Sequence, residues 1–272
     1  MCDELPAAVR RTGGLRIAAD EAELEDCRQQ LDAMRCDGLP VEAWSGEQGE
    51  GPLFPGDASF QPEMACRLVA ERLASLGVPL YGWSPVSRIA PGQVVTGGGT
   101  VSCRAVLVCV DGRLEQLLAE LAGTLRSARL QMLATAPLLQ EVPKRPVYRR
   151  YGYDHWQQLD TGELVLGGCR DMGGEEEWTT EALPSERVQV ALERLLVETV
   201  GLATGHELVT HRWAGIVGHT SSGLPVIREV RRGVFAAGGY CGTGNVVGRL
   251  AGRALAELAL DGASSTARLL GG

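Results

Sequence analysis

The sequence predicts a mixed α/β (α+β) fold in which two domains are interleaved along the chain. Short apolar segments that suit buried, parallel strands lie at 78–110 and again at 224–238, and segments that suit an antiparallel sheet lie between them, at 127–167. The second apolar stretch runs into a glycine-rich turn and an alanine- and leucine-rich helix. Because strands of one kind flank strands of the other, we expect interleaved rather than consecutive domains.

Composition excludes several classes of protein. The 272 residues carry a net charge of −8, which disfavours nucleic-acid backbones and anionic membranes as partners. No apolar run reaches the ~20 residues of a membrane span, and the acidic N-terminus lacks the apolar core of a signal peptide, so we expect a cytoplasmic protein. The eight cysteines form no CxxC and the four histidines have no ligand-like spacing, which favours buried, reduced thiols and no metal site.

The first third of the chain predicts a strand, two helices and a loop. The strand covers 12–18, and Asp20 with Glu23 forms a capping-box pattern at the start of the first helix. Residues 46–57 are rich in Gly, Glu and Pro and predict a loop. Pro62 begins the second helix and Gly77 ends it.

The rest of the chain alternates short strands with three helices. The helices are expected at 113–121, 184–200 and after the glycine-rich turn. The apolar run 105–110 suits a strand buried on both faces, and the acidic stretch 175–178 suits a solvated loop. The expected strands are 78–81, 86–89, 94–96, 101–110, 127–135, 147–157, 163–167, 212–217, 224–229 and 234–237.

The glycine-rich turn at 238–248 is the most informative segment. Gly242, Gly244 and Gly248 allow a close approach of the backbone, and the unpaired N–H groups of the following helix favour negative charge. The turn resembles a nucleotide-phosphate turn, but too few residues follow it for a βαβ unit of roughly 30 residues. It therefore has a role other than opening a Rossmann domain.

Five segments, taken in order, resemble the FAD-dependent amino-acid and amine oxidases, the superfamily of D-amino-acid oxidase, glycine oxidase and sarcosine oxidase. The similarity covers roughly residues 12 to 262. The order of the segments is specific, although each alone is weak. They are TGGLRIA at 12–18, GDASFQP at 56–62, AVLVCVDG at 105–112, WAGIVGHTSSGLPV at 213–226 and GGYCGTG at 238–244.

The resemblance implies a flavin that takes a hydride from the carbon beside an amine nitrogen. It implies the remnant of an FAD-binding Rossmann-like domain at 57–113 and 214–262, interleaved with an antiparallel-sheet substrate domain at 10–56 and 114–213. The late turn would lie at the pyrimidine end of the flavin, where the helix N-terminus stabilises negative charge. The implied cofactor-binding residues are Val86, Asp111, Gly112, Gly239, Tyr240, Gly242, Thr243, Gly244 and Asn245.

The chain departs from the family pattern in three respects. The opening GxGxxG unit, which holds the FAD pyrophosphate, is absent from the sequence. Val217 and Val246 stand where relatives place an Arg or a Lys, so a substrate with a carboxylate is less well supported than an amine. No cysteine lies at 213–222, where some relatives attach flavin covalently, so noncovalent FAD is expected.

Polar and aromatic side chains alternate along the expected strand 147–157. Together with Tyr240 they form the candidate substrate-binding set: Arg149, Tyr151, Tyr153 and His155. Alternation places the four on one face, either as a pocket wall over the flavin or as a solvated sheet face. Hydride transfer from a neutral amine needs no strong protein base, so no catalytic residue is assigned, and His155 is more simply structural.

Two functional hypotheses remain. The first is an FAD-dependent oxidoreductase acting on the C–N bond of an amine or amino acid, with a second chain as one source of the missing GxGxxG unit. The alternative is a flavin-free protein, either a non-redox enzyme or a small-molecule binding protein, that reuses the pocket. Retention of flavin by the purified protein discriminates between them.

Overall fold

The computed structural model describes residues 4–271, except 140–141, 143–144, 199–200 and 202–205. The chain divides into two compact units. Unit 1 comprises Met1–Val78, Leu130–Glu175 and Leu183–Ala214, and unit 2 comprises Pro79–Arg129, Glu176–Ala182 and Gly215–Gly272. The segment 57–78, which the resemblance assigns to the cofactor domain, is grouped with unit 1.

Most of an eight-stranded sheet lies in unit 1, in the order β14-β10-β13-β12-β11-β2-β4-β3. Strands β10 and β14 continue from this unit into unit 2. The strands are β2 (Gly14–Arg16), β3 (Glu42–Gly46), β4 (Gly49–Phe54), β10 (Leu125–Pro137), β11 (Val147–Arg149), β12 (Asp154–Gln158), β13 (Glu163–Gly167) and β14 (Val209–Thr220). A two-stranded sheet pairs β1 (Val9–Arg10) with β5 (Ser59–Phe60).

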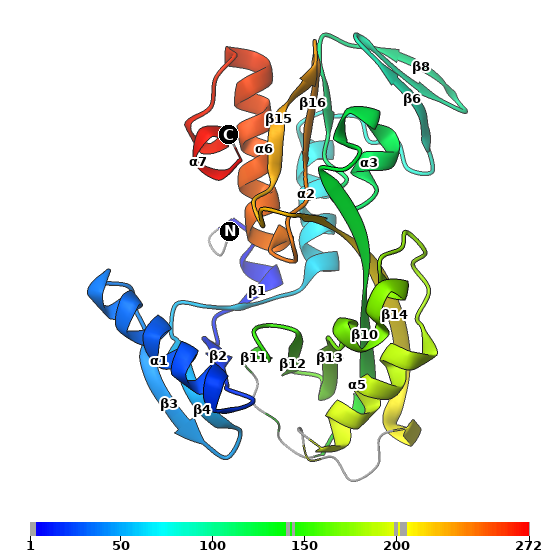
Figure 1. The fold of residues 1–272 in the computed structure, drawn as a ribbon. Helices are drawn as coiled ribbons and strands as arrows, with labels where there is room; N and C mark the ends of the chain where they lie inside the picture. The colour runs from blue at the N-terminus through cyan, green and yellow to red at the C-terminus, as the bar shows by residue number, and fades with distance from the viewer. Residues whose placement is uncertain (1–3, 140–141, 143–144, 199–200, 202–205, 272) are drawn as a thin grey trace. The chain divides into compact units, whose positions relative to one another are not determined.

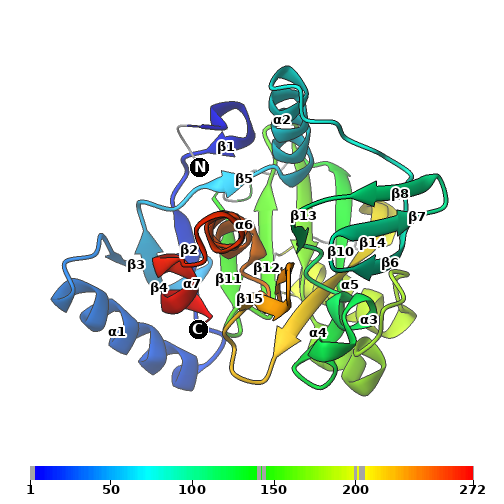
Figure 2. The same cartoon turned by 90° about the horizontal axis from the view of Figure 1, so that it is seen from above.

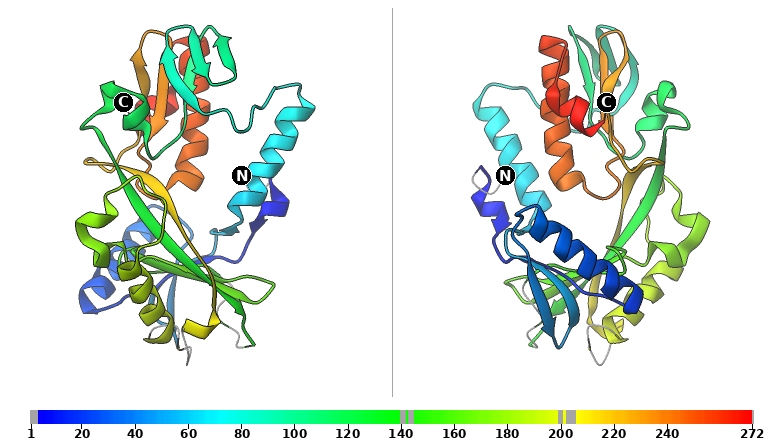
Figure 3. Two further views of the ribbon diagram at one scale, coloured as in Figure 1. Left: turned by 90° about the vertical axis from the view of Figure 1, so that its right-hand side faces the viewer. Right: turned by 60° about the vertical axis from the view of Figure 1, so that its left-hand side comes forward.

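One face of the large sheet forms the core of unit 1. Helix α5 (Glu186–Glu198) buries Val188 and Leu192 against Leu15, Trp156 and other core residues. Helix α1 (Glu21–Cys36) packs against β4 of the β3–β4 hairpin (Figure 3). The remaining helices of this unit are η1 (Pro6–Ala8), α2 (Pro62–Ser75), α4 (Arg170–Gly173) and η4 (His206–Leu208).

Unit 2 holds two three-stranded sheets. One has the order β15-β16-β9, with β16 parallel to β9 and antiparallel to β15. Figure 1 shows β15 and β16 beside α6. The other is the antiparallel sheet β6-β7-β8, visible in Figure 2. These strands are β6 (Val86–Ala90), β7 (Gln93–Thr96), β8 (Gly99–Ser102), β9 (Val106–Val108), β15 (Val226–Arg231) and β16 (Val234–Gly238).

Helix α6 (Gly244–Asp261) packs on the β15–β16 pair and buries Ala251, Ala254 and Leu255. The opposite side of the sheet packs on α3 (Leu114–Leu117) and on η2 (Ala119–Leu121). The C-terminal helix α7 (Ser265–Leu270) contacts α6, and η3 (Gly174–Glu177) overlaps the start of the segment 176–182. The predicted mixed α/β class is therefore confirmed.

Several predicted elements agree with the structure. Asp20 caps α1, because its side chain accepts a hydrogen bond of 2.9 Å from the N–H of Glu23. Helices α2, α5 and α6 form where they are expected, although 199–200 at the predicted end of α5 lie outside the described residues. In the part of the chain that the structure describes, no helix is both long and apolar enough to cross a membrane.

Four expectations are wrong. Residues 46–57 hold most of the β3–β4 hairpin rather than a loop, and 78–81 do not form a strand. The run 105–110 is buried at Val106 and Val108, but Leu107 is 39% exposed and Val110 48%. Glu177, expected in a solvated loop, has no exposed surface.

Candidate functional site

The glycine-rich turn joins β16 to α6 in unit 2. Gly239, Cys241 and Gly242 have positive φ angles of 72°, 51° and 92°. At Gly239 a Cβ atom would lie 2.7 Å from Cγ2 of Thr220, so a side chain there would collide with β14. The turn therefore needs glycine both for its backbone conformation and for close packing.

The carboxylate of Asp111 holds this turn in place. Its Oδ1 accepts a hydrogen bond of 3.0 Å from the N–H of Tyr240, and its Oδ2 accepts one of 3.1 Å from the N–H of Gly218. The N–H of Cys241 donates to the carbonyl of Gly218 at 2.9 Å. One side chain thus joins the ends of β14 and β16, and Asp111 itself adopts a φ of 54°.

The resemblance implied Asp111 only as a cofactor-binding residue, so the role of its side chain in holding the turn was not predicted. The Asp-Gly pair was the available signal, because Asp tolerates positive φ and accepts hydrogen bonds from nearby N–H groups. At Gly112 a Cβ would lie 2.8 Å from the carbonyl oxygen of Ile216, so the second residue of the pair allows β14 to pass close by.

The N-terminus of α6 presents backbone donors. Thr243 is the N-cap, and its hydroxyl donates to the carbonyl of Tyr240 at 2.7 Å instead of capping the helix. Within the described residues, the N–H groups of Gly242, Gly244 and Asn245 have no hydrogen-bond acceptor. Three N–H groups at a helix start form a region that favours negative charge.

These features fit the pyrimidine end of a flavin, which needs N–H donors and a close backbone approach. They supply nothing for the pyrophosphate, because the chain has no GxGxxG unit. Tyr240 is only 8% exposed, and its ring lies 3.2 Å from the position of a Cβ on Gly244. Val86 lies at the start of β6 and is 37% exposed.

The predicted strand 147–157 is instead a hairpin. Strand β11 ends at Arg149, which pairs with Asp154 at the start of β12, and residues 150–153 form the turn. Tyr151 and Tyr153 therefore lie in the turn, with 60% and 43% of their surface exposed. Arg149 shares the face of its partner Asp154, so the candidate substrate-binding residues do not form one wall.

A carboxylate distant in sequence holds the tip of this hairpin. The buried Glu23 of α1 accepts hydrogen bonds from the N–H groups of Arg150 (3.0 Å) and Tyr151 (2.6 Å). The Arg150 side chain pairs with Asp154 and Asp171 at 2.6 and 2.8 Å, and these carboxylates raise its pKa. The hairpin tip is thus held by the Glu23 carboxylate and by the ion pairs of Arg150, in addition to Gly152, which takes a positive φ of 88° in the turn.

The face of the large sheet opposite the α5 core holds His155. We call this surface the open face, and it follows two rows of paired residues across unit 1. Its members in the first row are Arg16, Tyr148, His155, Gly167 and Met132, and those in the second are Gln157, Val165 and Ala134. Gly14 lies two residues before Arg16 on β2 and therefore shares this face.

Two glycines make room on the open face. A Cβ on Gly167 would lie 2.4 Å from the Met132 sulfur and 2.7 Å from His155 Nε2, so these side chains converge above Gly167. A Cβ on Gly14 would lie 2.7 Å from Oδ2 of Asp57, which places the Asp57 carboxylate over β2.

The polar groups of the open face are mostly hydrogen-bond acceptors. Burial lowers the pKa of His155 and outweighs the nearby Asp154, so its imidazole is neutral at pH 7. Burial raises the pKa of Asp57, and burial together with the charge of Asp57 raises that of Tyr148. The Oε1 atom of Gln157 is buried and has no hydrogen-bond partner among the described residues.

A second polar group missed by sequence reasoning lies in unit 2. Glu177 forms a paired hydrogen bond with the Arg129 guanidinium at 2.8 and 3.0 Å, and both side chains are buried. The guanidinium carbon of Arg126 lies over the neighbouring Trp178 ring, 4.3 Å from the ring centre. The Trp178 and His219 rings meet edge-on, with their centres 5.6 Å apart. These contacts fix the segment 176–182.

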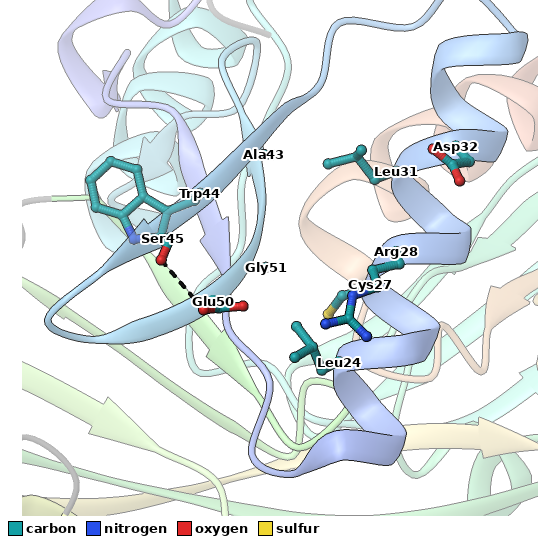
Figure 4. Close-up of a pocket in the computed structure, with 10 residues that line it drawn as sticks. All are labelled: Leu24, Cys27, Arg28, Leu31, Asp32, Ala43, Trp44, Ser45, Glu50 and Gly51. Carbon is teal, nitrogen blue, oxygen red and sulfur yellow. Dashed lines mark hydrogen bonds between the residues drawn. The ribbon is translucent and has the colours of Figure 1, made fainter.

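A hollow of about 430 Å³ lies between α1 and the β3–β4 hairpin (Figure 4). The indole ring of Trp44 points away from α1, so the hairpin contributes mainly small and polar groups. Burial raises the pKa of the Cys27 thiol on its helical wall. None of the predicted site residues is among its lining residues: Leu24, Cys27, Arg28, Leu31, Asp32, Ala43, Trp44, Ser45, Glu50 and Gly51.

Comparison with known proteins defines the class. Residues 1–258 match the family model DAO, described as FAD dependent oxidoreductase. The chain therefore belongs to the FAD-dependent oxidoreductase family, which confirms the predicted resemblance.

Individual relatives are more distant. The chain is 29% identical over 201 residues to a probable oxidoreductase OrdL of Rhizobium meliloti (strain 1021), a match covering 71% of this chain and 45% of that protein. The chain thus spans less than half the length of this curated relative. L-proline dehydrogenase from P. horikoshii has the same fold, with a TM-score of 0.80, 16% identity and coverage of 97% and 76% of the two chains. Glycine oxidase from Geobacillus kaustophilus also has this fold, with a TM-score of 0.79 and 20% identity, and the match covers 95% of this chain and 73% of that protein.

Proposed function

We propose that this chain binds the ring end of FAD noncovalently and takes part in oxidising the C–N bond of an amine or amino acid. The flavin, when bound, would accept a hydride from the carbon beside the nitrogen. The observation that supports this most directly is the turn clamped by Asp111, which presents the N–H groups of Gly242, Gly244 and Asn245. Family membership supports the same assignment.

In this proposal the protein supplies orientation and electrostatics. Asp111 fixes the turn, and the three N–H groups at the start of α6 stabilise negative charge on the pyrimidine end of the cofactor. The buried Tyr240 ring supports the first turn of α6. No side chain is assigned as a general base, because hydride transfer from a neutral amine does not require one.

We further propose that a second chain completes the cofactor site with a GxGxxG unit, adding a parallel strand to β9. In the described structure β9 is the edge strand of its sheet. Leu107 of this strand is 39% exposed, which is unusual for a parallel strand, because such strands are normally covered on both faces.

The visible spectrum of the purified protein tests the assignment. Bound oxidised flavin gives an absorption band near ~450 nm that belongs to the cofactor. We expect this band after titration with FAD in the presence of the GxGxxG partner, and a weak band or none without it. A colourless, cooperatively folded protein that ignores FAD under both conditions would favour the alternative, a flavin-free binding protein or non-redox enzyme.

The role of the turn has a matched pair of variants. Gly244→Val places a branched side chain against the Tyr240 ring and over the helix N-terminus, so flavin binding should be lost while the far-UV circular dichroism stays. Gly252→Val lies two turns further along α6 with no atom within 4 Å, and it should bind flavin normally. Equal flavin occupancy in the two variants would contradict the assigned role.

A further inference from the structure

Among the described residues in the two rows of the open face, none is a cation free of an acidic partner. Arg16 is the charged residue of its first row, paired with Tyr148 in the register of β2 and β11. Its guanidinium is already bonded to Asp26 and Gln30, each at 2.6 Å, and lies 3.5 Å from Glu23. A substrate carboxylate on this face would therefore compete with Asp26 and Glu23 for the Arg16 guanidinium.

Acceptors, in contrast, are available on the open face. The Asp57 carboxylate lies over Gly14, and no cation pairs with it among the described residues. Gln157 is on the same face, where its buried Oε1 has no donor. A buried acceptor without a donor costs free energy, and a ligand N–H group can remove that cost.

The apolar part of the face suits a small carbon skeleton. Met132, Ala134 and Val165 are half-buried and lie beside the polar groups in the same two rows. Because Gly167 has no side chain, the Met132 sulfur and the His155 ring both lie over it. The thioether of Met132 and the neutral imidazole of His155 therefore form this part of the open face.

We propose that the open face binds an amine that has no carboxylate, with Asp57 and Gln157 accepting hydrogen bonds from its N–H groups and Met132 and Val165 contacting its carbon skeleton. This assignment rests on the proposed C–N oxidation and specifies its substrate class. It agrees with Val217 and Val246, which stand where the family pattern has Arg or Lys in proteins that act on carboxylates.

A matched pair of ligands tests the proposal without the cofactor. Benzylamine and phenylglycine differ only by the carboxylate, and titration calorimetry on the purified 272-residue chain measures both. We expect benzylamine to bind at least ~10-fold more tightly, because the carboxylate of phenylglycine would lose its hydration near the like charge of Asp57 without a cation to pair with it. Phenylglycine binding as tightly as benzylamine would overturn the substrate class.

Variants then identify the residues. Asp57→Asn and Gln157→Met should each weaken benzylamine binding about 5- to 10-fold. Asp37→Asn, at the exposed end of α1, should leave it unchanged. Gln157→Met should also keep or raise the melting temperature, because it removes an unpaired buried acceptor, whereas loss of a structural amide would lower it. Unchanged binding in both Asp57→Asn and Gln157→Met contradicts the proposal.

The same measurements separate this proposal from the proposed function. Benzylamine binding that depends on Asp57, in a protein that never takes up FAD, supports the amine site and contradicts the oxidoreductase assignment. FAD uptake that depends on Gly244, without preference for benzylamine over phenylglycine, supports the oxidoreductase assignment and contradicts the amine site.

Discussion

The Asp111 carboxylate accepts a 3.0 Å hydrogen bond from the backbone N–H of Tyr240, 129 residues further along the chain. A second bond, from the N–H of Gly218, uses its other oxygen. The cofactor-type turn is therefore held by a charged side chain at the end of another strand. Its geometry is set before any ligand arrives, which reduces the entropy that binding must overcome.

Asp111→Asn should destabilise the protein. The amide retains one acceptor oxygen, so one of the two backbone N–H groups loses its partner, while Asn still tolerates the positive φ. We expect a decrease of about 1–3 kcal/mol in the free energy of unfolding. Urea denaturation measures it, with Asp37→Asn as the exposed control, and an unchanged midpoint would contradict the clamp.

Glu177→Gln should have a larger effect. The change removes the buried carboxylate that pairs with the Arg129 guanidinium, and the expected loss is about 3–5 kcal/mol. Replacing both partners together, as Arg129→Met with Glu177→Leu, removes the unpaired charge and should recover much of the stability. Thermal unfolding followed by circular dichroism compares the three proteins, and a double variant as unstable as Glu177→Gln would argue against this account.

His155 should make the protein less stable in acid. Its pKa in the folded state lies below the ordinary value of 6.5, so the unfolded chain binds the proton more readily. Well above pH 6.5, His155 is neutral in both states and does not change the free energy of unfolding. As the pH falls below 6.5 towards the lower pKa of His155 in the folded state, the unfolded chain takes up the proton first and the protein loses stability. His155→Gln should remove this part of the pH dependence, so the difference in unfolding free energy between the two proteins should grow between pH 7.5 and 5. A difference that stays constant would contradict burial of the neutral imidazole.

Gly167→Ala should be costly on the open face. The added methyl would lie 2.4 Å from the Met132 sulfur and 2.7 Å from His155, so one of them must move, at an expected cost of about 1–3 kcal/mol. Met132→Ala in the same protein should relieve part of the strain. Gly56→Ala, where the nearest atom is 3.9 Å away, is the neutral control. Equal stability of the two alanine variants would contradict the convergence of Met132 and His155.

Local signals in the sequence predicted local structure well. Asp20 and Glu23 correctly marked the start of α1. The order of five short segments predicted the family, and the parallel pairing of β9 with β16 agrees with the strand type expected there.

Distant interactions account for the errors. The hairpin at 147–158 resembles one long strand in sequence, because its turn depends on Glu23 of another element and on Arg150 pairing with Asp171. Strand β4 was missed because of its glycines. At Gly51 a Cβ would lie 2.1 Å from the carbonyl oxygen of Arg16, a close approach that only the partner strand explains. Neither constraint is visible within a short window of sequence.

The bond between Glu23 and the N–H of Tyr151 also bears on how the chain folds. Its two residues are 128 positions apart, so the ends of that long segment must meet before the turn at 150–153 acquires its support. Closing a long loop costs entropy that only later contacts repay, and such contacts slow folding. We therefore expect α1 to dock first and the β11–β12 hairpin to order late.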